Sequence, residues 1–137
     1  DFLQTTGEFS RHFENTYLEA PAVIKHEGIY HLLGSYCTGW APNALRHAVA
    51  ERIEGPWKEL KNPCLGSGNG TSFDSQPTFL LRSPDFQTII YLADRWRPEN
   101  AIDGRYVWLP LDFEGEECQL KWKDSWTLEP ASSDAFP

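Results

Sequence analysis

Apolar and polar residues alternate with a period of two along much of the chain, and the 3.6-residue period of helices is nearly absent. The alternation predicts β-strands, and ten prolines and ten glycines divide them into short segments. An acid–glycine pair at Glu27–Gly28 suits the positive φ of a tight turn and joins the first two strands as a hairpin. In the first half the predicted strands are 20–26, 29–34, 46–53 and a short edge strand at 57–60, followed by a polar, glycine-rich loop at 65–71.

The second half continues the same alternation. Its predicted strands are 77–82 and 88–93 around "SPDFQ", 106–113 and 119–122 around "EGEE", and one more at 124–128. The tail "EPASSDAFP" is polar, and we expect it to be loosely held. About a dozen short strands spaced by roughly 8 to 12 residues indicate a sandwich, a barrel or a propeller.

Two of the hairpins share a pattern that favours one of these three folds. The stretches "EAPAVIKHEGIYHLLGS" and "QPTFLLRSPDFQTIIYLAD" each begin with a chemically active type of side chain, Glu19 or Gln76, and have a proline within two residues. Each then runs strand, turn, strand. They begin roughly 57 residues apart, a spacing that suits a four-stranded blade plus a loop. The repeat favours a propeller fragment of two to three blades.

The length and composition are those of one globular domain. The chain has 137 residues, of which 40% are hydrophobic and 23% charged, enough to bury a core. Aromatic residues reach 14%, with six Trp, five Tyr and eight Phe. Most of these rings are expected in the core and in strand pairing, but flat Trp and Tyr rings also stack on the apolar faces of sugars.

Charge and hydropathy exclude several classes of partner. The net charge of −8 argues against a nucleic acid or an anionic membrane, because both require patches of Lys and Arg. No apolar run is long enough for a transmembrane helix. The chain starts at Asp1 without a signal peptide, which suggests a processed chain or a piece of something longer.

Neither cysteines nor histidines show the spacing of a metal site. The three cysteines lack a CxxC pair, so at most one disulfide is expected and the redox compartment stays open. The four histidines are expected on separate segments, so no zinc is expected. The residues in question are Cys37, Cys64, Cys118, His12, His26, His31 and His47.

Five motifs in one order carry a resemblance. They are "LEAPAVIKHEGIYHLLGSYCTGWAPN", "GPW", "SQPTF", "YLADRWRPEN" and "YVWLPLDF". Together they resemble glycoside hydrolase family 43, and within it the branch of exo-acting β-1,3-galactan galactosidases. Those enzymes are five-bladed β-propellers with four-stranded antiparallel blades. The resemblance implies an all-β chain, a partial propeller domain over 1–137 that supplies the later blades, about three of the five: a lead-in at 1–17, blades at 18–128 and a polar tail at 129–137.

The resemblance implies that Glu19 is the general acid that protonates the departing glycosidic oxygen. The alternative is a solvated glutamate at the end of a strand. A general acid must hold its proton near neutral pH, so we expect a partly apolar, aromatic-walled place around this carboxyl. Pro21 is expected to bias Ala20 toward extended backbone and so to set where Glu19 points.

Gln76 in "FDSQPTF" is the second catalytic residue that the resemblance implies. Inverting glycosidases pair the acid with a carboxylate base that activates water, and most of the family takes this base from its first blade. The galactan branch is similar to this chain in having glutamine at the position of Gln76. A plain amide is a very poor base, so a contact to water or sugar is favoured over proton acceptance. A glutamine capping a loop before a strand is the alternative.

Two loops supply the expected sugar contacts. In "CTGWAPN", Gly39 allows close backbone approach, Trp40 offers a stacking face and Asn43 offers an amide, although a structural turn with a packed indole explains the motif equally well. The family more often has a hydroxyl residue where this chain has Cys37, which puts one polar contact in doubt.

The resemblance also places "ADRWRPEN" near the floor of the sugar pocket. Asp94, Arg95 and Trp96 would hold sugar hydroxyls there. A structural pairing of acid and arginine between blades is the alternative, and it is favoured more for Arg97 than for Arg95.

These features imply an inverting exo-glycosidase acting on β-1,3-linked galactan, such as the backbone of arabinogalactan. The alternatives are a family 43 α-L-arabinofuranosidase or β-xylosidase, and a non-catalytic carbohydrate-binding propeller fragment. No cofactor is expected, and nothing in the sequence indicates a structural calcium ion. The resemblance implies a secreted or periplasmic protein. An open propeller leaves a long unpaired strand edge, so the chain is expected to need N-terminal blades that it lacks, or another chain.

Overall fold

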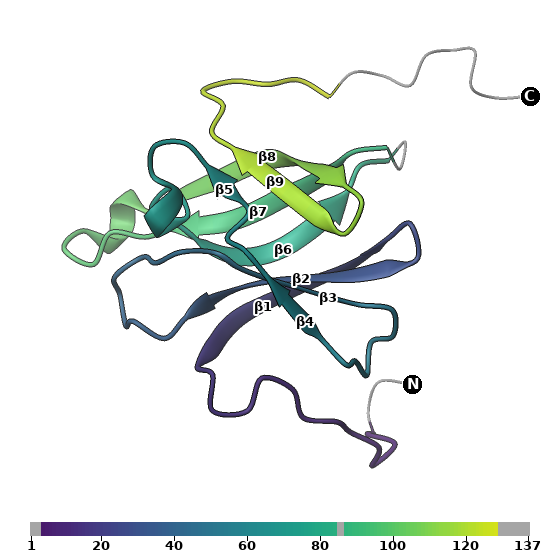
Figure 1. The fold of residues 1–137 in the computed structure, drawn as a ribbon. Helices are drawn as coiled ribbons and strands as arrows, with labels where there is room; N and C mark the ends of the chain where they lie inside the picture. The colour runs from purple at the N-terminus through teal and green to yellow at the C-terminus, as the bar shows by residue number, and fades with distance from the viewer. Residues whose placement is uncertain (1–3, 85–86, 129–137) are drawn as a thin grey trace, which may run out of the picture.

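The computed structural model describes residues 4–84 and 87–128, which form two antiparallel sheets that pack face to face (Figure 1). The first sheet has the order β1 (Leu18–His26), β2 (Ile29–Tyr36), β3 (Arg46–Ala50) and β4 (Lys58–Leu60). The second has the order β5 (Cys64–Leu65), β9 (Glu117–Lys121), β8 (Arg105–Glu114), β7 (Ile89–Arg95) and β6 (Gln76–Arg82). The 3-10 turns η1 (Asn69–Thr71) and η2 (Ala101–Asp103) are the described helical segments, and no described helix is long and apolar enough to cross a membrane. The all-β prediction is confirmed.

Each sheet is a four-stranded antiparallel meander, as expected of propeller blades. The second carries an additional strand, β5, which pairs in parallel with β9. The described residues thus form two blades, fewer than the expected three or so. The reason is that the hairpin of β8 and β9 extends the sheet of β6 and β7 and does not begin another.

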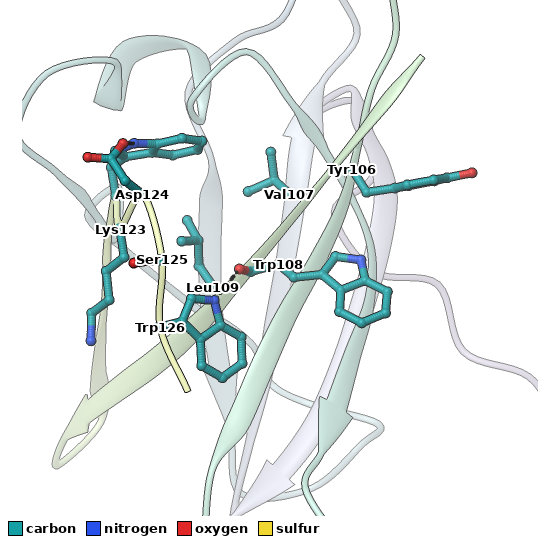
Figure 2. Close-up of a pocket in the computed structure, with 9 residues that line it drawn as sticks. Tyr106, Val107, Trp108, Leu109, Lys123, Asp124, Ser125 and Trp126 are labelled. Carbon is teal, nitrogen blue, oxygen red and sulfur yellow. Dashed lines mark hydrogen bonds between the residues drawn. The ribbon is translucent and has the colours of Figure 1, made fainter. Parts of the chain in front are cut away.

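Most strand ends lie within two residues of the prediction, but one predicted strand is shorter, one is absent, and β5 was not predicted. The strand predicted at 46–53 ends at Ala50, and the segment 124–128 forms no strand. That segment follows β9 in the chain and lies beside β8, where the Trp126 indole N–H donates to the Trp108 carbonyl at 2.7 Å (Figure 2). A side-chain hydrogen bond thus stands where a ladder bond would extend the sheet. The described residues therefore hold nine strands, not about a dozen, and the predicted tail at 129–137 lies outside them.

The hydrophobic core lies between the two sheets. It is built from alternate residues of the facing strands, as the period-2 pattern requires. Its largest fully buried side chains include Leu33 of the first sheet and Tyr91, Leu109 and Leu120 of the second. Burial raises the pKa of the Tyr91 hydroxyl, which therefore stays protonated and lies 3.4 Å from the Ser75 hydroxyl.

A pair of histidines lies buried at the same interface. The register of β2 and β3 pairs Leu33 with His47 and brings His31 next to it, with Nδ1 of His31 3.2 Å from Nε2 of His47. His26 stacks on Phe113 of the other sheet, with ring centroids 4.1 Å apart. Strand pairing thus gathers three histidines that were expected to lie apart, although no three described His, Cys, Asp or Glu residues are arranged to hold a metal ion.

Exposed ion pairs join the sheets beyond this histidine pair. Lys58 binds Glu116 and Lys61 binds Glu117, each at 2.7 Å. The acidic turn between β8 and β9, which contains Glu116, therefore forms ion pairs across the interface between the sheets and is also exposed to solvent. Because these side chains are exposed, each pair contributes at most about 1 kcal/mol.

Lowering the pH from 7.5 to 5.5 should destabilise the chain. Burial lowers the pKa of both His31 and His47 to about 4, and each also repels the charge of a neighbouring histidine. The unfolded chain, with ordinary histidine pKa values, binds more protons below pH 6.5, so this stability is full above that pH and is lost toward pH 4. Urea unfolding should show a lower midpoint at pH 5.5.

The exposed histidine His12 supplies the control for this prediction. A His12→Asn variant should keep the whole decrease, because the His12 side chain is exposed and is not part of the buried pair. An unfolding midpoint that stays constant between pH 7.5 and 5.5 would contradict the assignment of a neutral buried pair.

Candidate active site

The site begins where β1 and β6, each an edge strand of its sheet, lie against each other (Figure 1). Glu19 lies near the start of β1 and Gln76 is the first residue of β6. Each is followed by a proline and a break in register, between Glu19 and Ala22 and between Pro77 and Phe79. Proline is tolerated in a sheet at outer strands and bulges because it cannot donate to the ladder. The repeat seen in the sequence is therefore a repeat of structure.

The bulge in β1 corrects one expectation. Ala20 has φ of 48°, in the left-handed region, and not the extended backbone expected before Pro21. The register break between Glu19 and Ala22 therefore holds Ala20 outside the extended backbone that a following proline favours. A left-handed residue with a Cβ costs roughly 1–2 kcal/mol, so the surrounding sheet holds Ala20 in this strained conformation next to Glu19.

Glu19 and Gln76, 57 residues apart in sequence, are in contact. The Gln76 side-chain nitrogen Nε2 lies 3.5 Å from Glu19 Oε2 and 2.8 Å from the Ser35 hydroxyl oxygen, to which it donates. Ser35 is buried and pairs with Glu19 across β1 and β2. The structure therefore brings together the two residues expected to be catalytic and adds a serine that the sequence reasoning did not single out.

Cys37 lies on the other side of Glu19. Its thiol contacts the Tyr17 carbonyl at 3.4 Å, and desolvation followed by the neighbouring Glu19 carboxyl raises its pKa. The thiol is thus protonated at neutral pH and lies beside Glu19. All three cysteines are free, and Cys37 is the exposed one.

The expected apolar, aromatic-walled place around Glu19 is not formed by the described residues. The Glu19 side chain is exposed, and its recorded contacts are to the amide of Gln76 and the thiol of Cys37. Two blades leave one side of this carboxyl open to solvent.

The loop after β2 is braced by Asn43. Its Oδ1 accepts from the Tyr36 backbone N–H at 3.0 Å, and its Nδ2 donates to the Tyr36 carbonyl and the Thr38 hydroxyl at 2.8 and 2.6 Å. Because both amide hydrogens are used, Asn43 has only one acceptor lone pair left for a sugar. Gly39 has φ of 63° with open space around it, so its main requirement is the left-handed turn.

Trp40 and Trp96 meet across the two sheets. Their rings pack edge to face with centroids 5.8 Å apart, and the Trp96 indole N–H donates to the Trp40 carbonyl at 3.1 Å. Trp40 is 71% exposed, which leaves a ring face free for a ligand. Each sheet thus contributes one of the two expected aromatic contacts.

The arginines of "ADRWRPEN" are already engaged. Arg95 donates from Nε to the Phe73 carbonyl at 3.1 Å and lies over the Trp122 ring, so it holds the loop before β6. Arg97 pairs with Asp103 at 2.8 Å, within the connection from β7 to β8 and not between blades as the structural alternative had it. Asp94 is opposite Gln76 in the ladder, and no described residue hydrogen-bonds its carboxylate. Of this motif, Asp94 and Trp96 remain available to a ligand.

Solved structures with the same arrangement are family 43 enzymes. A β-1,3-galactosidase of glycoside hydrolase family 43, solved with galactodeoxynojirimycin, is 41% identical over 81% of this chain, with a TM-score of 0.78. A second family 43 β-1,3-galactosidase is 30% identical over 93% of the chain, with a TM-score of 0.88. An exo-β-1,3-galactanase from Phanerochaete chrysosporium, solved with β-1,3-galactotriose, is 36% identical over 76%, with a TM-score of 0.68.

The chain belongs to glycoside hydrolase family 43. It covers 32%, 27% and 23% of those three proteins, that is, a third of their length or less. Neither a protein-family model nor a curated protein sequence matches it. The likeness therefore concerns the propeller region that contains β1 and β6.

Two cavities lie on the second sheet of this family 43 chain. One of about 300 Å³ is lined by Asp94, Trp96 and Tyr106 among others, and so adjoins Gln76 through its ladder partner. A larger one, of about 460 Å³, lies between β8 and the segment 122–126 (Figure 2) and contains none of the residues expected to be catalytic. Neither cavity is lined by Glu19 or Gln76, and the smaller one is linked to the site through Asp94.

An Asn43→Ala substitution should destabilise the chain by about 1 kcal/mol, because it removes the three hydrogen bonds that hold the loop of Trp40 and water replaces them only in part. The measurement is the free energy of unfolding in urea. Asn100→Ala is the matched control, since no described residue hydrogen-bonds that exposed side chain, and it should stay within about 0.5 kcal/mol of the parent. Equal stability of the two variants would show that Asn43 does not hold the loop.

Proposed function

We propose that this chain, together with the further blades that its natural form supplies, is an exo-acting glycoside hydrolase that cleaves β-1,3-linked galactan with inversion. We call this assembly the assembled propeller. The observation that carries the proposal is the contact of Glu19 with Gln76 at the junction of two blades, in a chain 41% identical to a β-1,3-galactosidase. The substrate is an oligo- or polysaccharide with galactose at its non-reducing end, as the arabinogalactan backbone has.

In this proposal Glu19 is the general acid. Its proton passes to the glycosidic oxygen as the bond from that oxygen to the anomeric carbon breaks. A water on the opposite face of the sugar attacks the same carbon, held by the amide oxygen of Gln76, and loses its proton to neighbouring water. Gln76 acts as the residue that positions this water, because an amide accepts a proton poorly.

Substrate binding must separate the two side chains. Inverting enzymes hold their two catalytic carboxyl groups about 6.5–9.5 Å apart so that sugar and water fit between them. The 3.5 Å contact between Gln76 Nε2 and Glu19 Oε2 is shorter than that and long for a hydrogen bond. A weak contact of this kind opens at little cost when a sugar enters. Trp40, with its exposed ring beside Trp96, is the proposed stacking face for that sugar.

In the assembled propeller, further blades would cover apolar surface that the two described blades leave exposed. Figure 2 shows Tyr106 and Trp108 on the side of β8 away from Val107 and Leu109, and Trp108 is 56% exposed. On β6 of the same sheet, Phe79 is 57% and Leu81 39% exposed. Apolar surface of this kind marks an interface. A further blade packed there would cover it, and closing the ring would also wall the open side of Glu19. A secreted or periplasmic location fits a polymeric substrate.

Hydrolysis of aryl glycosides of galactose, arabinose and xylose by the assembled propeller tests the sugar. Release from the β-galactoside and from β-1,3-galactobiose is expected, and ¹H NMR of the first product should show α-galactose. Preferred release from the arabinoside or xyloside would favour the other family 43 activities. Binding of galactobiose without hydrolysis would leave a carbohydrate-binding propeller.

Replacing Glu19 by Gln should lower kcat on β-1,3-galactobiose by about 10²- to 10⁴-fold, the usual contribution of a general acid. Binding of galactose, measured by calorimetry, should be retained because the side chain keeps its size. The control is Glu27→Gln, at the exposed turn between β1 and β2, which should turn over normally. Full activity of Glu19→Gln would rule out the assigned role.

A further inference from the structure

Ser35 occupies a position at the site that the proposed reaction leaves unassigned. It lies near the end of β2, is 4% exposed, and is the ladder partner of Glu19. Its hydroxyl oxygen accepts a hydrogen bond of 2.8 Å from Gln76 Nε2, across from one blade to the other. A buried hydroxyl in this place connects the strand of the acid with the strand of the amide.

The hydrogen bonds of Gln76 determine which of its atoms is left for a ligand. Its amide nitrogen has two hydrogens, one directed to Ser35 at 2.8 Å and the other toward Glu19 at 3.5 Å. No described residue donates to its amide oxygen, Oε1. Gln76 therefore offers an acceptor to the site, which is what positioning a water by its O–H requires.

The two contacts of the amide differ in strength. The bond to Ser35 has the ordinary length of a good hydrogen bond, whereas the contact to Glu19 is at the limit. When a sugar separates Glu19 from Gln76, the Ser35 bond is the one that persists. Both contacts are made by the NH₂ end of the amide, and the serine keeps that end in place when Glu19 has moved away.

We propose that Ser35 is a positioning residue that anchors the Gln76 amide, so that Oε1 faces the attacking water throughout the reaction. This inference rests on the proposed function for its catalytic consequence, but the anchor itself is a property of the folded chain. Without it, the amide samples other rotamers and the water loses its fixed acceptor. Since misplacement of a reacting group lowers turnover more than ground-state binding, the effect falls on kcat.

The direct test is NMR of the Gln76 side-chain amide in ¹⁵N-labelled chain. A Gln76→Ala spectrum assigns its NH₂ pair by the loss of two signals. In Ser35→Ala, solvent exchange of the bonded amide hydrogen should become about 3- to 10-fold faster, as expected for one lost hydrogen bond. Ser75→Ala is the matched control, because it removes an equally buried hydroxyl next to Gln76 in the chain that bonds to Ser72 and Tyr91. An exchange rate in Ser35→Ala equal to that in Ser75→Ala would overturn the anchor.

The kinetic test uses β-1,3-galactobiose and the assembled propeller. Ser35→Ala should lower kcat by about 3- to 10-fold and leave KM within about twofold, whereas Ser75→Ala should change neither. An unchanged kcat in Ser35→Ala would overturn the catalytic consequence. If the parent protein hydrolyses no galactobiose while Gln76 exchange still responds to Ser35→Ala, the proposed function fails and the anchor stands.

Discussion

The contact between β1 and β6 is the interaction on which the site depends. Both are edge strands of their sheets, and both have a bulge near their start, where a proline is tolerated. Packing them together brings Glu19 of one blade to Gln76 of the next, although 57 residues separate them. Arg82 continues the same junction by donating to the Lys25 carbonyl. The proposed chemistry therefore depends on the packing of one blade against the next.

The bulge in β1 sets which side chain faces the site. From the turn, β1 and β2 pair so that residue numbers sum to 55, as for His26 with Ile29 and Ala22 with Leu33; after the bulge Glu19 pairs with Ser35, a sum of 54. An unbroken ladder would place Tyr36 opposite Glu19. Since one residue of slip exchanges the two faces of a strand, the left-handed Ala20 is what delivers a buried hydroxyl to Gln76.

Much of this was predictable from the sequence, and the rest was not for identifiable reasons. Period-2 alternation and the turn at Glu27–Gly28 located the first hairpin, and the recurring proline marked Glu19 and Gln76 as equivalent positions. Alternation says nothing about side-chain hydrogen bonds, so it predicted one more strand at 124–128, where Trp126 instead bonds by its indole. A bulge also changes no residue type, so the place of Ser35 required the actual register.

The histidines show the same limit of sequence reasoning. Their separation along the chain favours independent side chains, but His31 and His47 lie on neighbouring strands and their register brings the rings together. Once the pair is buried against the second sheet, protonation of either ring opposes folding, because the loss of hydration and the repulsion from a neighbouring histidine outweigh the attraction of Glu116 and Glu117. Sequence spacing measures distance along one strand, whereas a sheet places residues beside each other across strands.

One change, the addition of further blades, would bury both the open side of Glu19 and the exposed face of β8. The Glu19 carboxyl is exposed to water, and so are the large apolar side chains of Trp108 and Phe79, which is unusual for a free surface. A further blade on that face and closure of the ring would remove water from both, so burial that stabilises the propeller would also prepare its acid. Folding and catalysis in this chain are thus expected to depend on the same additional surface, and a form that hydrolyses galactan should also be the form in which Trp108 is protected.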